Sequence, residues 1–187
     1  MADSMITKQA LAASIKELME REPLSKISVG DITSNCGVNR QTFYYHFKDK
    51  YELVNWIYYT ETVKLMSSFS DRAHWTDGLG ALCRYMRDNK RFYINALSTP
   101  GQNSFQEYLL EFARGLVRSL AEELLGESPI GEEDLEFIAD FYAFAFVGLI
   151  MKWARHGMKE EPDGYILRVK EMTDASIHYA LEKYKKE

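Results

Sequence analysis

The sequence predicts an all-α protein of about nine helices. Apolar residues recur at helical spacing along nearly the whole chain, and no run of alternating β-branched residues is bounded by hairpin turns. With 187 residues, 46% of them apolar, the chain can bury a core without chemical cross-links. Its two cysteines, Cys36 and Cys83, belong to no CxxC or Cys/His cluster, so we expect neither a disulfide framework nor a structural zinc site.

The first two helices are marked by their ends. Leu11, Ile15, Leu18 and Met19 lie at helical spacing on a helix that should begin near Thr7 and end before Pro23. Ser28 can cap a second, short helix, with the Asp31 carboxylate accepting a hydrogen bond from the Ser28 backbone as in a capping box. Glycine adopts the left-handed conformation readily, so this helix should end at Cys36-Gly37.

The remaining helices follow from similar signals. Asn39 should cap a third helix over 40–47, and a long fourth helix should open near Lys50. Five more are expected at about 77–89, 91–97, 104–125, 132–155 and 164–184, with breaks at 99–101, 126–131 and 157–162. We expect residues 1–52 to form one domain and 53–187 a second helical domain.

Residues 28–53 have the pattern of a helix-turn-helix, two short helices joined by a glycine-containing turn. Ile32, Val38, Phe43 and Phe47 are predicted to point inward, the last two at i and i+4 on one face of the third helix. The opposite face then presents Arg40, Gln41, Tyr44 and Tyr45, with Thr42, His46, Lys48 and Lys50 at its edges. Arg and Gln can contact guanine and adenine bidentately in a DNA major groove, while tyrosine and lysine side chains hold phosphates. The N-termini of the second and fourth helices could also bind phosphates.

This segment closely resembles the TetR family of transcriptional regulators. The resemblance is strong over about residues 7–53 and is carried by Ile32, Cys36, Gly37, Val38, Asn39, Thr42, Tyr44, Phe47, Lys50 and Leu53. Residues 40–57 look most like the branch that contains activators of dihydroxyacetone-kinase operons. Pro23 and Cys36 depart from the usual family residues without altering the outward face.

The resemblance implies a homodimer that binds a pseudo-palindromic operator in double-stranded DNA. It implies that Arg40, Gln41 and Tyr45 face bases, while Ser28, Thr42, Tyr44, His46 and Lys50 face phosphates; Asn39 and Lys48 complete the expected contact set. It also implies control by a small-molecule effector or a protein coactivator bound to the C-terminal domain.

The charge distribution sets limits on DNA binding. The chain carries 23 basic and 28 acidic residues, a net charge of −5 that excludes a polybasic binder of the histone kind. Residues 1–52 are neutral, with seven charges of each sign. The competing hypothesis is therefore a helical protein-interaction module without DNA binding.

Two further sites are expected after residue 53. The many aromatic residues of this second domain either pack in the core or line an effector pocket. The residues expected to line such a pocket are Trp56, Tyr59, Tyr85, Phe105, Tyr108, Phe112 and Tyr142. The helix over 132–155 is apolar nearly all round, so it is either buried in its own subunit or part of a four-helix bundle across a twofold axis. The residues chosen for that dimer interface are Phe137, Phe141, Phe144, Gly148, Ile177 and Leu181.

Other function classes lack their motifs. The four histidines have no partner at metal-ligand spacing, and no Gly-x-Ser-x-Gly, Cys/His pair or phosphate loop is present, so we expect no metal, no cofactor and no enzyme. The most apolar run, 137–151, is shorter than the roughly 20 residues of a membrane-spanning helix, and no secretory signal is visible. A cytoplasmic protein without a membrane partner is expected.

Overall fold

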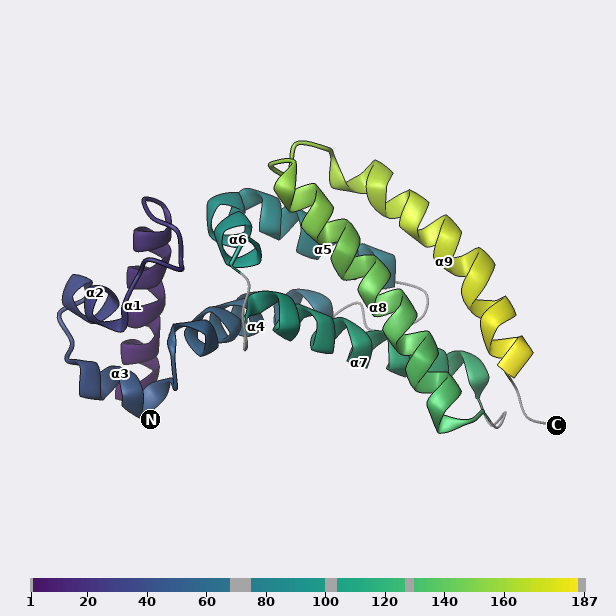
Figure 1. Ribbon diagram of the computed structural model, residues 1–187, viewed down its shortest axis with the longest axis horizontal. Helices are drawn as coiled ribbons and strands as arrows, with labels where there is room; N and C mark the ends of the chain where they lie inside the picture. Colours follow the sequence, from purple (N-terminus) through teal and green to yellow (C-terminus); the bar gives the residue numbers. More distant parts are fainter. Residues whose placement is uncertain (1, 68–74, 100–103, 127–129, 185–187) are drawn as a thin grey trace.

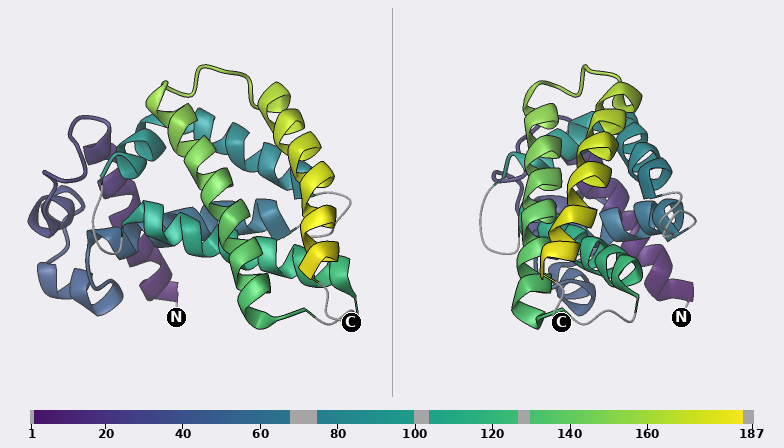
Figure 2. Two further views of the ribbon diagram at one scale, coloured as in Figure 1. Left: turned by 45° about the vertical axis from the view of Figure 1, so that its right-hand side comes forward. Right: turned by 90° about the vertical axis from the view of Figure 1, so that its right-hand side faces the viewer.

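The computed structural model describes residues 2–67, 75–99, 104–126 and 130–184, which form nine α-helices and no β-strand, as predicted. The helices are α1 (Ala2–Met19), α2 (Val29–Asn35), α3 (Arg40–His46), α4 (Lys50–Ser67), α5 (Trp75–Asp88), α6 (Lys90–Leu97), α7 (Phe105–Leu125), α8 (Glu132–Arg155) and α9 (Pro162–Tyr184). Helices α1–α3 form one end of the molecule, while α8 and α9 lie side by side toward the other (Figures 1 and 2). Helix α4 leads from the small end into the larger helical body.

Most helix ends follow their local signals. Ser28 and Asp31 form the predicted capping box of α2, and Gly37 after it has a φ of 71°. Helix α8 has the predicted bounds. Helix α1 starts at Ala2 instead of near Thr7, because nothing in residues 2–6 interrupts a helix, and α9 starts at Pro162, since proline is accepted at a first helical position. The predicted breaks at 99–101 and 126–131 lie largely outside the described residues.

The core is built in two parts. A main cluster runs without interruption from α1 through α2, α3 and α4 into α5–α8, and it includes Leu11, Ile15, Ile32, Phe43, Phe47 and Leu53. A second cluster joins α7, α8 and α9. Because a single core connects α1–α3 to α4 and beyond, the small end is fixed on the larger body by packing.

Candidate nucleic-acid interface and internal cavity

Helix α3 is anchored through one face. Phe43 is fully buried and Phe47 is 3% exposed, and their rings lie 5.9 Å apart, as the i, i+4 spacing predicted. Ile32 of α2 is fully buried with them, and Val38 in the turn packs against the same cluster. The predicted inward set is therefore confirmed, and it fixes the rotation of α3 about its axis.

The opposite face of α3, which we call the α3 outer face, consists of Arg40, Gln41, Tyr44 and Tyr45. All four side chains are exposed, with Tyr44 at 58% and Tyr45 at 82% of their surface. Their aromatic rings are therefore largely in water. Each ring contacts a neighbour on the same helix, Tyr44 with Phe43 and Tyr45 with His46. The face thus presents long hydrogen-bonding side chains outward from a rigid helix.

Arg40 lies across α2. Its guanidinium occupies the space beside Gly30 so closely that a Cβ built on Gly30 would come within 2.3 Å of it. The positive charge also helps to lower the pKa of Asp31, although the hydrogen bonds from Ser28 to that carboxylate are the larger cause. Reaching a base edge would require Arg40 to swing away from this position.

Three residues of the expected DNA-contact set, two of them expected at phosphates, are engaged in helix caps. Ser28 donates its hydroxyl to Asp31 at 2.6 Å and accepts from the Asp31 amide. Asn39 Oδ1 accepts from both the backbone amide and the hydroxyl of Thr42, at 2.7 and 2.9 Å. These bonds fix the starts of α2 and α3, and the Ser28 and Thr42 hydroxyl hydrogens are used within the protein.

Lys50, expected to face a phosphate, has its ammonium group engaged within the protein. Its Nζ donates to the carbonyl oxygens of Leu24 and Ile27 at 2.7 Å each and of Ser25 at 3.3 Å, so its three hydrogens hold the α1–α2 connection instead of pointing to a phosphate. Burial of the ammonium lowers its pKa.

The start of α4 is also occupied, contrary to the expected phosphate site there. Asp49 Oδ1 accepts from the backbone amides of Tyr51 and Glu52, both at 2.8 Å. Two amides of the first turn, which have no partner within the helix, therefore donate to a carboxylate of the protein itself. Of the other expected contact residues at this end, Lys48 is exposed and His46 is half-buried beside Tyr45.

Polar contacts that no sequence pattern predicts tie the small end to the larger body. Asn95 of α6 accepts from the Leu24 amide at 2.7 Å and donates to the carbonyls of Met19 and Glu22 at 3.1 and 2.7 Å. Glu61 of α4 pairs with Lys16 of α1 and accepts from the Tyr85 hydroxyl of α5. An asparagine in a short helix carries no pattern that would reveal such distant partners.

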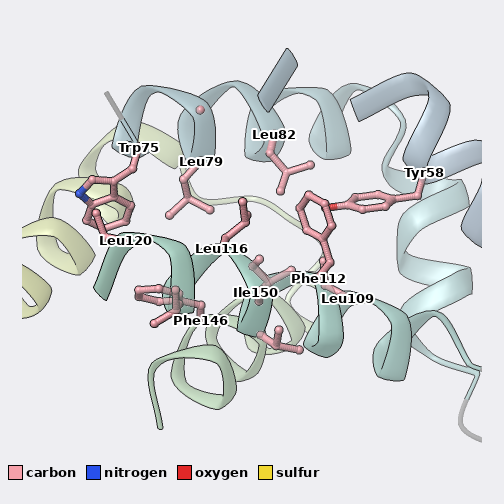
Figure 3. Close-up of a pocket in the computed structure, with 14 residues that line it drawn as sticks. Tyr58, Trp75, Leu79, Leu82, Leu109, Phe112, Leu116, Leu120, Phe146 and Ile150 are labelled. Carbon is pink, nitrogen blue, oxygen red and sulfur yellow. The ribbon is translucent and has the colours of Figure 1, made fainter. Parts of the chain in front are cut away.

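A cavity of about 110 Å³ lies between α4, α5, α7 and α8 (Figure 3). Of the seven residues expected to line an effector pocket, Phe112 does so. Phe105 and Tyr108 pack edge-on against Tyr58 beside it, and Tyr85 binds Glu61. Trp56 and Tyr59 instead line a surface groove between α1 and α4, and Tyr142 reaches Ser176 of α9. The seven residues therefore do not surround one cavity, because helical spacing does not reveal which faces converge.

The expected dimer interface is divided by the structure. On α8, Phe137, Phe141 and Phe144 are 63%, 60% and 59% exposed, and Gly148 is exposed on the same side. On α9, Ile177 and Leu181 are each 3% exposed and belong to the core with α7 and α8, so they are not on the surface. The exposed large apolar side chains of α9 are Leu167, Met172, Tyr179 and, at its end, Tyr184.

Two other sequence expectations concern metals and membranes. Within the described ranges, no group of three or more His, Cys, Asp or Glu residues could hold a metal ion. Among the described helices, α8 alone is long and apolar enough to cross a membrane. At 24 residues it is longer than the apolar run 137–151 suggested. The core helix of a water-soluble protein can have the same length and composition.

Two family models match the chain. Residues 11–57 match the model described as "Bacterial regulatory proteins, tetR family", and residues 73–175 match a "Transcriptional regulator C-terminal region". Among curated proteins, the dhaKLM operon transcriptional activator DhaS of Lactococcus lactis is 37% identical over 93 residues, half of each chain. The Tn10 TetC protein of Escherichia coli is 23% identical over 142 residues, 71% of this chain and 72% of that protein.

Solved structures share the fold. The dihydroxyacetone kinase operon activator DhaS superposes with a TM-score of 0.65 at 22% identity, covering 97% of this chain and 99% of that one. NalD of Pseudomonas aeruginosa, the secondary repressor of the MexAB-OprM multidrug efflux pump, gives 0.61 at 20% identity over 92% and 96% of the two chains.

Proposed function

The chain belongs to the TetR family and is a transcriptional regulator, and we propose that it acts in the cytoplasm as a homodimer on a pseudo-palindromic DNA operator. The observation that carries the proposal is that Phe43 of α3 and Phe47 at its C-cap are buried while the α3 outer face is exposed. Core packing explains the buried phenylalanines. It does not explain four long polar or phenolic side chains held together in solvent.

In the proposed complex, α3 enters the major groove. Gln41 and Tyr45 face bases, and Arg40 joins them after leaving Gly30. Tyr44, His46 and Lys48 lie toward the phosphates, where contacts set the register without reading the sequence. Lys50 does not take part directly; it holds the α1–α2 connection.

The second copy is proposed to bind on α8 and α9. Helix α8 exposes three phenylalanines on one side, and α9 exposes Met172 and Tyr179. Exposing such large apolar side chains to water is unfavourable, which favours a protein contact at this surface. Pairing this surface across a twofold axis makes a four-helix bundle. Two α3 helices must then lie about 34–36 Å apart, or a multiple of this, to reach successive major grooves.

Residues 1–52 are proposed as the DNA-binding domain and 53–187 as the regulatory and dimerisation domain. A signal received by the second domain, from a small molecule or a partner protein, changes the separation of the α3 helices through α4. The Asn95 and Glu61 contacts provide the connection.

Selection of DNA from a random pool tests the proposal. We expect the full chain to enrich an inverted repeat, and Tyr45→Ala to weaken binding to it by about 1–3 kcal/mol if its contact is to a base. Tyr59→Ala is the matched control, since Tyr59 is an exposed tyrosine on α4, outside the α3 outer face. Enrichment of no sequence, or equal losses for both variants, would favour the interaction-module hypothesis.

A further inference from the structure

Gly30 is a glycine that its own backbone does not require. It lies in the first turn of α2, and it is not among the described glycines with a positive φ. Within a helix, glycine is less favourable than alanine, because it loses more conformational freedom on folding. The structure offers a reason for this glycine outside the backbone of α2, in a side chain that comes from α3.

The space beside Gly30 is filled by the guanidinium of Arg40, the first residue of α3. A Cβ on Gly30 would lie 3.0 Å from Cζ and 3.1 Å from Nε of Arg40, and closer still to Nη2. Any side chain at position 30 would therefore displace the guanidinium, which is the far end of a flexible side chain. By contrast, Gly115 of α7 has open space where its Cβ would be.

Charge also favours this position of Arg40. The hydrogen bonds from Ser28 are the main cause of the lowered pKa of Asp31, and the positive charge of Arg40 adds to the lowering. The carboxylate is shared, since the backbone amide and the hydroxyl of Ser28 both donate to its Oδ2, at 2.8 and 2.6 Å. Arg40 is exposed, and attraction between exposed charges is weak. The guanidinium can therefore leave α2 at a small cost.

A guanine in the major groove is a better partner for Arg40 than α2. In the observed position the cation lies beside the first turns of both α2 and α3, where helix dipoles disfavour positive charge. A guanine offers two acceptors, O6 and N7, that match the guanidinium, in a groove flanked by phosphates. Binding to DNA should therefore draw Arg40 away from Gly30, and the free energy of leaving α2 is lost from the affinity.

We propose, resting on the DNA binding proposed above, that Gly30 and Asp31 hold Arg40 against α2 in the free protein until a matching base releases it. Gly30 is then a positioning residue that acts through Arg40. It sets the fraction of free molecules whose guanidinium is ready to contact a base, and the apparent affinity falls in proportion to that fraction. A residue of α2 thus controls how strongly the α3 outer face binds DNA.

A double-mutant cycle tests the release, with the inverted repeat that the wild-type chain selects from a random pool as the probe. Gly30→Ala displaces the guanidinium, so it should tighten binding by about two- to fivefold for each half-site, the range of a weak exposed ion pair. Arg40→Ala should weaken binding, and adding Gly30→Ala to it should have no further effect. The matched control is Gly115→Ala, at an exposed helical glycine with open space, which should bind like the wild type.

A measurement without DNA tests the contact itself. The pKa of the Asp31 carboxyl, followed by carbon NMR, should rise in Arg40→Ala and in Gly30→Ala, because the positive charge is removed or displaced. It should keep its wild-type value in Gly115→Ala. Circular dichroism checks that each variant folds, and if Gly30→Ala does not, the titration of Arg40→Ala still decides whether Arg40 lies beside Asp31.

Two results would overturn the proposal. One is an Asp31 pKa that is unchanged in Arg40→Ala. The other is an effect of Gly30→Ala on operator binding that is absent, weakening, or equal with and without Arg40, since Gly30 would then not act by releasing that side chain. A wild type that selects no DNA sequence would contradict the proposed function and, with it, release by a base. The Asp31 titration distinguishes that failure from the absence of the contact.

Discussion

Lys48 and Lys50 are two lysines at the start of α4 for which the structure predicts opposite effects. Lys50→Ala removes three hydrogen bonds to carbonyls of the α1–α2 connection, two of them at 2.7 Å. Bonds from a charged donor contribute about 1.5–3 kcal/mol each, but the half-buried ammonium has lost part of its hydration, which offsets part of the sum. We expect a net loss of about 2 kcal/mol in unfolding free energy, or roughly 4–8 °C in the unfolding midpoint.

Lys48→Ala should behave in the reverse way. Its side chain is exposed, so the unfolding free energy should change by less than about 0.5 kcal/mol. Affinity falls with salt, and each lost phosphate contact should make the slope of log affinity against log salt shallower by about 0.9. In a dimer two contacts are lost, so the slope should become shallower by about 1.8.

Urea unfolding and DNA titrations at several salt concentrations measure both quantities on both variants. The reasoning is refuted if Lys50→Ala keeps the wild-type stability and reduces the salt slope, because Lys50 would then contact a phosphate in the complex, as the sequence first suggested. A slope unchanged in Lys48→Ala would remove Lys48 from the proposed interface.

Three more predictions concern other contacts. Asp31→Asn weakens the α2 cap. Because the hydrogen bonds from Ser28 lower the pKa of Asp31 below 3.8, the stability difference should be full near pH 7 and decrease as the pH falls below 3.8, as urea unfolding across this range will show; a difference independent of pH would contradict this. Asn95→Ala leaves the buried Leu24 amide unpaired and should lower the unfolding free energy by about 2–3 kcal/mol, with faster hydrogen exchange over 19–27. Asn95→Asp cannot donate to the carbonyls of Met19 and Glu22, so full stability of that variant would contradict this. Phe141→Glu, on the exposed side of α8, should yield a folded monomer in sedimentation, and a persisting dimer would place the interface elsewhere.

The success of the sequence at the helix-turn-helix has a local cause. Ser28, Asp31, Gly37 and Asn39 act on backbone groups within four residues of themselves, so their effects can be recognised without a fold. The spacing of Phe43 in α3 and Phe47 at its C-cap likewise indicates which face of α3 is buried. Both features depend only on helix geometry.

Predictions that needed the relative placement of helices were less successful. Helix α9 has apolar side chains on more than one face, and only packing shows that Ile177 points into the subunit while Met172 points out. The aromatic residues after residue 53 could not be sorted into core and cavity, so Phe112 was found and Tyr58 was missed. The hydrogen bonds of Lys50 could not be predicted, because its partners lie more than twenty residues earlier.

The order of the helices, their caps and the outward face of α3 were thus determined by the sequence alone, since each depends on neighbours a turn or two away. The tertiary structure decided which residues surround the internal cavity and which side of α9 reaches solvent. It also decided that Lys50 and Asn95 form hydrogen bonds with the backbone of the α1–α2 connection. Those outcomes depend on crossing angles and distances between helices, which arise from the packing of all side chains together and leave no periodic trace in the chain.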